Sequence, residues 1–564
     1  MVAPQLRHIA STTIGSSIAL TAKDFIQPPP NTTTHNKTTQ NTATQNTRTT
    51  DITPLNTEHA LNSIKRFIDS RIKTLNITSP TKIQATYPEF PSGLNPHKAG
   101  ELRKALEALK GTPILDSTRG LPTQSANTLT RLKIGLAFTQ KLLQGEYTGY
   151  TSAGGAPQDR EAIAHLINKR LSLSHSIANL TADHVLLTNG GAEAANITFT
   201  TLSQLGYNIH LPSPTYALYS RQLNTFSPNA KVFELSATQG ITDNYLTRFE
   251  QTLKHSPHSK HALVLTIPGN PNGTTPSQTM LNKLAKLQDK YPGLQLIVDL
   301  AYADNVEEGK LVKQTHEALN PRKTIYIMSG SKGLGEPGLR GGLIFATPEM
   351  ISDISKTELT NTLNTHPIAA IAMKAALSLT QKQLENKTQF YLERMQPIHD
   401  ELQALGVVPK GEKPGPMFVY LTLFKTLIDA NTPLPKEAQE ALRTLGINTP
   451  NDTVQNDVDL AAYIACQYGL MGVPDKHLAD NGDVEYGVRF YGAYENLNLR
   501  DTLIDRLKDM VTDIQHLPTL NNNTSAIISQ VLNSNPLTTK LTTKEMEHLI
   551  KIPEAETLNY FNNI

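Results

Sequence analysis

Lys332 is the residue of this chain whose setting most strongly suggests chemistry. It lies in IMSGSKGLGEPGLRGGLIF, residues 327–345, between a strand-like apolar run and a glycine-rich segment. A lysine placed in this way could bind a phosphate, assist a serine nucleophile or attack a carbonyl group itself. Each of these three alternatives requires different companion residues elsewhere in the chain.

Two of the alternatives lack their companions. Three glycines after the lysine spell the dinucleotide pattern G-x-G-x-x-G, but Pro337 falls where the following helix should continue. In the phosphate-binding Walker pattern the lysine follows the glycines, whereas Lys332 precedes them. The spacing Ser329-x-x-Lys332 matches acylating serine enzymes, yet their S-D-N and K-T-G tripeptides occur nowhere in the chain.

The third alternative is a lysine that forms a Schiff base with a carbonyl cofactor, and its companions are present. Pyridoxal 5′-phosphate (PLP) requires an aspartate for its pyridinium nitrogen, a platform for its ring and a phosphate site. Because ligands gather at the carboxyl ends of parallel strands, the residues that follow strand-like runs are the candidates. They are Asp299 after LQLIV, Tyr216 after NIHLP, Asn270 after HALVLTIPG, and Gly190, Gly191 and Ala192 after HVLLTN. Ser329 and Arg340 flank the lysine and could both reach the phosphate.

The elements that would position these residues alternate along the chain. Between residues 159 and 374, helical patterns such as REAIAHLINKRL separate β-branched, two-sided apolar runs such as LQLIVDL and TIYIMSG. This alternation predicts an α/β fold with a mainly parallel sheet that helices cover on both faces. Residues 376–516 mix long helical patterns with strands such as PMFVYLTLF and YGVRFYG, which predicts a smaller α+β domain.

Five motifs, in order and with matching spacing, resemble those of the class I and II aminotransferases of PLP fold type I, which include aspartate aminotransferase. SGSKGLGEPGLRGG is similar to the family's lysine motif S-x-[ST]-K with an arginine eight residues further on, and NPNG is similar to N-P-[TN]-G. DLAYAD resembles D-E-A-Y, and YGVRFYGAYEN resembles the strand that carries the substrate-binding arginine. YTSAGGAPQDREAIA resembles Y-x-x-x-x-G-x-x-x-L-R-x-A-I-A, with Asp159 in place of the usual leucine. The resemblance covers roughly residues 116–489.

The resemblance assigns a role to each matching residue. Lys332 would hold PLP as an internal aldimine and, once displaced by substrate, would carry the proton between the substrate Cα and the cofactor. The implied cofactor ligands are Asp299 at the pyridine nitrogen, Asn270 and Tyr302 at the phenolic oxygen, Tyr216 on the ring face, and Ser329, Arg340, Gly191 and Ala192 at the phosphate. Arg489 would bind the substrate α-carboxylate, with Gly120 beside it. Tyr150 matches a tyrosine that reaches the phosphate from the neighbouring subunit, which implies a homodimer with active sites at the subunit interface.

The implied activity is that of a PLP-dependent transaminase, which moves an amino group between an L-amino acid and a 2-oxo acid by a ping-pong mechanism. The TLNTHPIAAIA region lacks the second arginine of the dicarboxylate branch, so a neutral or aromatic amino acid is expected rather than aspartate or glutamate. The same residues could serve a β-lyase, a β-decarboxylase or a ring-forming synthase, because these enzymes also begin with a Cα carbanion. A non-catalytic PLP-binding regulator is a further alternative, but residues 1–50 show only polar low complexity rather than a DNA-binding segment.

Composition sets the remaining expectations. The 564 residues carry 52 Lys and Arg against 50 Asp and Glu, so the charge indicates no nucleic-acid partner. The single cysteine, Cys466, suits a reducing compartment, expected to be the cytoplasm, and it indicates no metal site. No apolar run is long enough to cross a bilayer, so no membrane association is expected. We expect a disordered Thr/Asn-rich segment at 1–56, an arm and part of the small domain at 57–150, the large PLP-binding domain at 151–375, the small domain at 376–516 and an extension of unknown role at 517–564.

Overall fold

The computed structural model describes the backbone of residues 96–534 apart from 119, 146–148, 173–178, 410–412, 430, 448–451 and 479–483, and the side chains between 98 and 516. The Thr/Asn-rich segment predicted at 1–56, the first part of the predicted arm and the end of the predicted extension lie outside the described residues. The domain boundaries stay predictions. Within the described part of the chain, no helix is long and apolar enough to span a membrane.

Seven strands form the large sheet, in the order β2-β8-β7-β6-β5-β3-β4. Their bounds are β2 Val185–Thr188, β3 Asn208–Ser213, β4 Val232–Ser236, β5 His261–Thr266, β6 Leu294–Asp299, β7 Thr324–Ser329 and β8 Gly342–Phe345. Neighbouring strands are parallel except at β8, which runs antiparallel to both β2 and β7. The mainly parallel sheet predicted from the sequence is confirmed, with β8 as an antiparallel strand that the sequence analysis did not single out.

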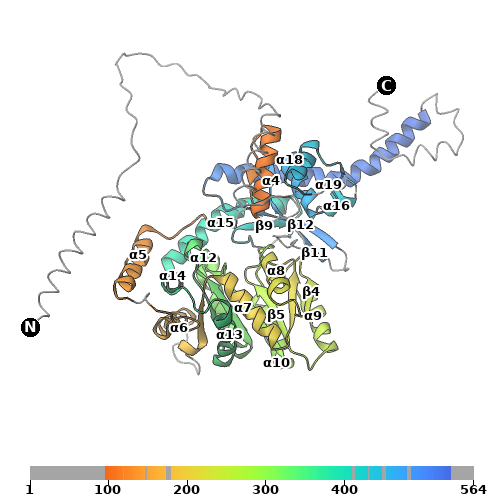
Figure 1. Ribbon diagram of the computed structural model, residues 1–564. Helices are drawn as coiled ribbons and strands as arrows, with labels where there is room; N and C mark the ends of the chain where they lie inside the picture. Colours follow the sequence, from red (N-terminus) through yellow and green to blue (C-terminus); the bar gives the residue numbers. More distant parts are fainter. Residues whose placement is uncertain are drawn as a thin grey trace, which may run out of the picture. The chain divides into compact units, whose positions relative to one another are not determined.

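Helices cover both faces of this sheet, which is why its central strands are apolar on both sides. One face packs against α7 Gly191–Gln204, α8 Ala217–Phe226 and α13 Pro348–Asn361. The other packs against α6 Pro157–Leu171, α9 Asp243–His255, α10 Gln278–Lys290, α11 Leu311–Ala318 and α14 Pro367–Leu377. Figure 1 shows the two sets of helices around the strands.

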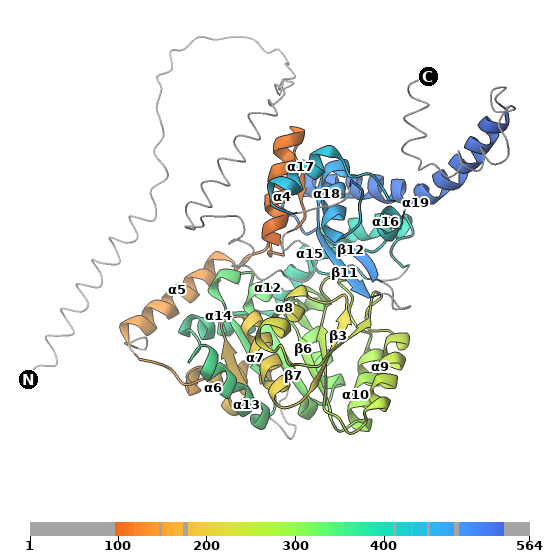
Figure 2. The same ribbon diagram turned by 45° about the vertical axis from the view of Figure 1, so that its right-hand side comes forward.

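A second, smaller sheet has the antiparallel order β11-β12-β9. Its strands are β9 Phe418–Leu421, β11 Val473–Leu478 and β12 Val484–Tyr491, and the short strands β1 Leu115–Asp116 and β10 Leu470–Met471 pair in parallel beside it. The helices around it are α4 Pro96–Lys110, α15 Gln381–Ala404, α16 Lys425–Asp429, α17 Lys436–Thr444, α18 Asp457–Tyr468 and α19 Leu497–Ser534. Figure 2 shows these helices gathered around β11 and β12. The backbone of α19 continues through residues 517–534, the first part of the predicted extension of unknown role.

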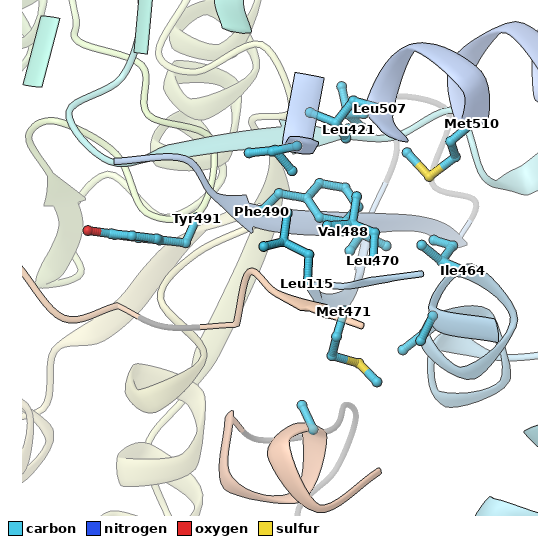
Figure 3. Close-up of a cluster of buried hydrophobic side chains, with 14 of the residues drawn as sticks. Leu115, Leu421, Ile464, Leu470, Met471, Val488, Phe490, Tyr491, Leu507 and Met510 are labelled. Atoms are coloured by element: carbon cyan, nitrogen blue, oxygen red, sulfur yellow. The ribbon is translucent and has the colours of Figure 1, made fainter. Parts of the chain in front are cut away.

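The two faces of strand β12 have different surroundings: one packs into the core of the smaller domain, and the other carries the predicted site residue Arg489. Figure 3 shows Val488 and Phe490 among the buried side chains of the smaller domain, which include Leu470 and Met510. Because side chains alternate along a strand, Arg489 points to the opposite face. The apolar residues on either side of this arginine therefore determine its direction.

The remaining elements are short connections and one separate helix. Helix α12, Gly330–Gly333, follows β7 directly, and α5, Thr128–Leu143, contacts α14. The 3₁₀ turns are Ala182–His184, Ala303–Asn305, Glu307–Gly309, Pro321–Lys323 and Pro337–Leu339. Two of these turns, at 303–305 and 337–339, lie next in sequence to predicted site residues.

Candidate active site

Lys332 lies in α12, immediately beyond the carboxyl end of the central strand β7. Its Nζ donates a hydrogen bond to the carbonyl oxygen of Gly120 and lies 5.7 Å from the centroid of the Tyr302 ring. Burial lowers the pKa of the Lys332 amine to about 8, and the positive charges of Arg489 and Arg340 contribute in the same direction. The uncharged, nucleophilic form of this amine is therefore far more populated at neutral pH than that of an ordinary lysine.

Asp299 ends strand β6, next to β7, with only 7 % of its surface exposed. Its carboxylate accepts hydrogen bonds from the Tyr219 hydroxyl, at 2.7 Å, and from the backbone N–H of Ala301, at 2.9 Å. Burial raises the pKa of this carboxyl, whereas the two donors oppose that change. A buried carboxylate at a strand end is suited to a cationic partner such as a protonated ring nitrogen.

Tyr219 is a residue of this site that the sequence analysis missed. The pattern SPTYALY predicted Tyr216 as a cofactor ligand, but Tyr219, one turn further along, supplies the hydroxyl that contacts Asp299. The Tyr219 ring also meets the Tyr216 ring edge-to-face, with 5.4 Å between centroids. Tyr219 could have been predicted from one feature of the sequence: an aspartate that ends a buried strand requires hydrogen-bond donors from a neighbouring element.

Asn270 connects the lysine side of the site to Arg489. The Asn270 Nδ2 lies 3.5 Å from the Tyr302 hydroxyl, and its Oδ1 accepts a hydrogen bond from Arg489 Nη1 at 3.0 Å. Arg489 is 8 % exposed, and its Nη2 donates a hydrogen bond to the Thr118 carbonyl oxygen at 3.3 Å. Its Cζ lies 4.3 Å from the centroid of the Phe418 ring. Its buried Nε has no hydrogen-bond partner among the described residues. The arginine thus retains donor capacity for a further anion.

Gly120 lies between the two cationic groups. A Cβ atom at this position would be 3.9 Å from Lys332 Nζ and 4.0 Å from Arg489 Nη2. The structure therefore brings Lys332, Arg489 and Gly120 together, although Gly120 is more than 200 residues from the other two in sequence. In the sequence, only the resemblance to the aminotransferases linked these three residues.

The predicted phosphate ligands meet at the first turn of α7. Gly190, with a φ of +94°, precedes this helix, and a Cβ atom there would lie 2.2 Å from Arg340 Nη2. A Cβ at Gly191 would lie 3.3 Å from the Ser329 Cβ. We call Gly190, Gly191, Ser329 and Arg340 the anion cradle. Its glycines leave room that a side chain would fill, and the N–H groups of a helix N-terminus attract anions.

Three further predicted ligands occupy different settings. The Ala192 carbonyl oxygen, in the first turn of α7, accepts a hydrogen bond from Gln222 Nε2 at 2.7 Å. Tyr216 is 37 % exposed, with an electrostatic interaction with both Arg489 and Asp299. Tyr150 is 85 % exposed, and no contact with Lys332 or the anion cradle is described for it. The single chain thus gathers every predicted site residue except Tyr150.

These residues match the requirements of one cofactor. An anion cradle, a buried aspartate, an amide and a phenol lie around an amine with a lowered pKa, all at the carboxyl edge of the large sheet. PLP carries a phosphate, a basic ring nitrogen, a phenolic oxygen and an aldehyde, and each has a matching group here. The fold and the site together define a PLP-dependent enzyme of fold type I.

Comparison with known proteins identifies the family within that class. Residues 118–451 match the family of class I and II aminotransferases, so the chain belongs to this family. An aspartate aminotransferase of Pyrococcus horikoshii is 23 % identical over 287 residues, which cover 50 % of this chain and 70 % of that protein. The aspartate/prephenate aminotransferase of Thermus thermophilus is 25 % identical over 367 residues, covering 64 % and 87 % of the two chains. The chain is therefore an enzyme of the PLP-dependent aminotransferase type.

Solved structures agree on the fold. The aspartate aminotransferase of Thermotoga maritima aligns with a TM-score of 0.56 and 20 % identity, over 75 % of this chain and 98 % of that one. The enzyme from Rhizobium meliloti aligns with a TM-score of 0.58 and 17 % identity, over 75 % and 97 % of the two chains. At this level of identity the likeness concerns the fold alone.

Proposed function

We propose that this enzyme transfers an amino group from an L-amino acid to a 2-oxo acid by a ping-pong mechanism in which Lys332 is the catalytic residue. The observation that carries the proposal is the setting of the Lys332 amine, which contacts Gly120 beside Arg489, is acted on by the charges of Arg489 and of Arg340 in the anion cradle, and has its pKa lowered to about 8. Such an amine can act as a nucleophile and can both accept and release a proton near neutral pH.

The surrounding residues would hold and tune PLP. When bound, PLP supplies a ring that withdraws electrons from the substrate Cα. Asp299, oriented by Tyr219, would keep the proton on the ring nitrogen, while Asn270 and Tyr302 would hydrogen-bond the phenolic oxygen. Ser329, Arg340 and the N–H groups of Gly191 and Ala192 would hold the phosphate, and Tyr216 would pack on the ring face.

Two residues would then handle the substrate. Arg489 would bind the α-carboxylate with the donors that its present partners do not use, and Gly120 leaves space beside it. Lys332 would remove the proton from the substrate Cα and return it to C4′ of the cofactor, because its lowered pKa suits both steps. The reverse sequence with a second 2-oxo acid completes the exchange.

A homodimer in the cytoplasm is part of the proposal. None of the residues of α5 is buried, and Leu129, Leu132 and Leu136 expose 60 %, 57 % and 61 % of their surface along it. Exposed apolar stripes of this kind are typical of protein interfaces. Tyr150, exposed in the single chain, would approach the anion cradle of the partner subunit. The single, buried cysteine suits a reducing compartment.

The first experiment locates the reactive lysine. The purified protein, loaded with PLP, is reduced with borohydride and digested, and the pyridoxyl-labelled peptide is identified by mass spectrometry. We expect the label on Lys332 and none in Lys332→Ala. Lys387 is the internal control, since burial also lowers the pKa of its amine to about 8 although it contacts Gln124 instead of the anion cradle. A label on Lys387, or on no residue, would refute the proposal.

The second experiment separates transamination from the other outcomes of the same carbanion. The loaded enzyme is mixed with single L-amino acids, and the 2-oxo acid, ammonia and carbon dioxide are quantified. Transamination predicts one 2-oxo acid per active site, followed by turnover only when a second 2-oxo acid is added. Release of ammonia would instead support a β-lyase, and release of carbon dioxide would support a β-decarboxylase.

A further inference from the structure

The face of the smaller sheet that carries Arg489 also carries a row of polar residues that the proposed reaction does not use. In the register of the sheet, Arg489 is opposite Tyr420 on β9, Gly487 is opposite Asp475 on β11, and Glu485 is opposite His477. Paired residues share a face, and so do residues two apart on one strand. Asp475 and His477 therefore continue outward from the substrate-binding arginine on the same face.

Gly487 permits the contact between Tyr420 and Asp475. A Cβ atom at Gly487 would lie 2.0 Å from the Tyr420 hydroxyl oxygen, so any larger residue would displace the phenol. Across this space the Tyr420 hydroxyl donates a hydrogen bond to Asp475 Oδ2 at 3.1 Å and lies 3.0 Å from His477 Nδ1. When Asp475 is ionised it accepts the phenol proton, and His477 then donates from Nδ1 to the phenol oxygen.

This arrangement leaves an acceptor unpaired. Burial lowers the pKa of the His477 ring to about 4, so the ring is neutral at pH 7 and its Nε2 is an acceptor. That nitrogen is buried in a side chain only 3 % exposed and has no hydrogen-bond partner in the part of the chain that the structure describes. The Glu485 Oε2, which lies 3.4 Å away, is another acceptor. Two acceptors that face each other require a donor between them.

A cavity of about 350 Å³ lies beside this row. It is lined by residues from the end of β3, from α8 and β4, and from β11, among them Ser213, Ser220, Arg221, Glu234, Asp475 and His477. The pKa of the Asp475 carboxyl is raised to about 7, first by burial and further by the negative charges of Asp457 and Glu234. A positive charge also acts on Asp475, that of Arg489, which the proposed reaction assigns to the substrate α-carboxylate. The cavity wall itself carries Glu234 and Asp475 together with Arg221 and Lys476.

We propose that this cavity receives the substrate side chain, that the preferred substrate is a diamino acid whose side chain ends in an ammonium group, and that Asp475 is the counter-ion of that group. The inference rests on the proposed function, because Arg489 must hold the α-carboxylate for the side chain to extend along the same sheet face. An ammonium group offers three donors and no acceptor, which matches Asp475, His477 Nε2 and Glu485.

The two cations near the cavity do not favour an acidic side chain. Lys476 also lines the cavity and is exposed, but it lies at the next position of β11, where alternation places it on the face opposite Asp475. Arg221, on α8, interacts electrostatically with the Tyr216 phenol. An acidic substrate would have to approach Arg221 while meeting Glu234 and Asp475 in the same cavity. The neutral or aromatic substrate expected from the sequence would leave the acceptors unpaired.

The test compares side chains of equal length. L-ornithine and L-norleucine have side chains of the same size that end in an ammonium and a methyl group. With the PLP-loaded enzyme, we expect kcat/KM for L-ornithine to exceed that for L-norleucine, L-phenylalanine and L-glutamate at least 10-fold. Asp475→Asn should lower kcat/KM for L-ornithine by about 10- to 100-fold and change that for L-norleucine less than about 3-fold. Glu440→Gln, an exposed carboxylate of α17, is the control and should change neither value.

Binding provides a readout that does not depend on turnover. Lys332→Ala loaded with PLP is titrated with L-ornithine by calorimetry, alone and combined with Asp475→Asn, and we expect the second substitution to weaken binding at least 10-fold. A preference for L-glutamate, L-phenylalanine or L-norleucine, or no effect of Asp475→Asn in a protein with unchanged thermal unfolding, would overturn the inference. If no amino acid is turned over but L-ornithine still binds in an Asp475-dependent way, the proposed function is wrong and the cavity assignment stands.

Discussion

Lys332 is partly buried and Asp299 is buried, and the loss of water around each favours its uncharged form. For Lys332 this is the reactive form, since only a neutral amine attacks a carbonyl group. For Asp299 the uncharged form could not pair with a cationic ring nitrogen. The Tyr219 hydroxyl and the Ala301 N–H stabilise the charged carboxylate by hydrogen bonds. The same physical effect therefore assists one residue and has to be opposed at the other.

The lowered pKa of Lys332 predicts the pH dependence of cofactor capture. The rate at which the apo-protein captures PLP should rise with pH and level off above about pH 8, because the amine loses its proton in that range. Stopped-flow absorbance measures this rate directly. Lys332→Ala should abolish the absorbance change. A midpoint near 10.5, the value of an ordinary lysine, would contradict the environment described here.

Tyr219 should be required for the ionised state of Asp299. Tyr219→Phe removes a hydrogen bond to a charged group, so the pKa of Asp299 should rise and the acidic limb of the activity profile should move to higher pH. We expect a loss of about 10-fold in kcat/KM at neutral pH. Tyr245→Phe is the matched control, since the Tyr245 hydroxyl is buried without a hydrogen-bond partner in the described structure. Equal effects of the two substitutions would contradict the role of Tyr219.

At the scale of elements, a buried ion pair joins three helices at the edge of the large domain. Asp159, in the first turn of α6, accepts a hydrogen bond from Lys374 of α14 at 2.6 Å, and Lys141 of α5 lies 3.5 Å away. The Asp159 side chain is 8 % exposed, whereas that of Lys374 is 31 % exposed. This contact gives a physical reason for an aspartate at this position of α6.

Removal of one partner of this pair should cost more than removal of both. Asp159→Leu is expected to lower the free energy of unfolding by about 1–3 kcal/mol, because Lys374 loses its counter-ion. Addition of Lys374→Met should recover part of this loss, since an apolar pair can replace a buried ion pair. Urea unfolding of both single variants and the double variant provides the coupling energy. Strictly additive effects would show that the two side chains do not depend on each other.

At the scale of the whole molecule, helix α5 exposes its leucines to solvent in the single chain. A helix with no buried residue and three leucines more than half exposed on one stripe is expected to pack against another surface. A second copy of this chain is the partner that we propose, and Tyr150 would complete the anion cradle from across that interface.

Substitution on this stripe should separate the subunits. Leu132→Glu combined with Leu136→Glu is expected to give a monomer with at least 10-fold lower affinity for PLP, because charge on both copies opposes their association. Sedimentation velocity reports the assembly, and fluorescence titration reports the affinity for PLP. Leu392→Glu, at an exposed leucine of α15, is the control and should stay dimeric. A double variant that remains a dimer with normal affinity would place the interface elsewhere.

The sequence by itself determined which residues can do the chemistry. Lys332 with Arg340 eight residues on, Asp299 at the end of a buried strand and Asn270 in NPNG are local patterns, and local patterns are visible in a linear chain. The apolar, two-sided strands likewise predicted the parallel sheet, because burial on both faces constrains every position of a strand. Resemblance to a known family added the roles of Arg489 and Gly120, which no local pattern could supply.

Only the tertiary structure decided how distant segments meet. Tyr219 reaches Asp299 because α8 packs beside the end of β6, and the Gly190 φ of +94° matters because Arg340 lies where its side chain would be. Asp475, Tyr420 and His477 form one polar row only through the register of β9, β11 and β12. Register and packing depend on contacts between residues far apart in the chain. They therefore determine the proposed side-chain cavity, whose residues no local sequence pattern brings together.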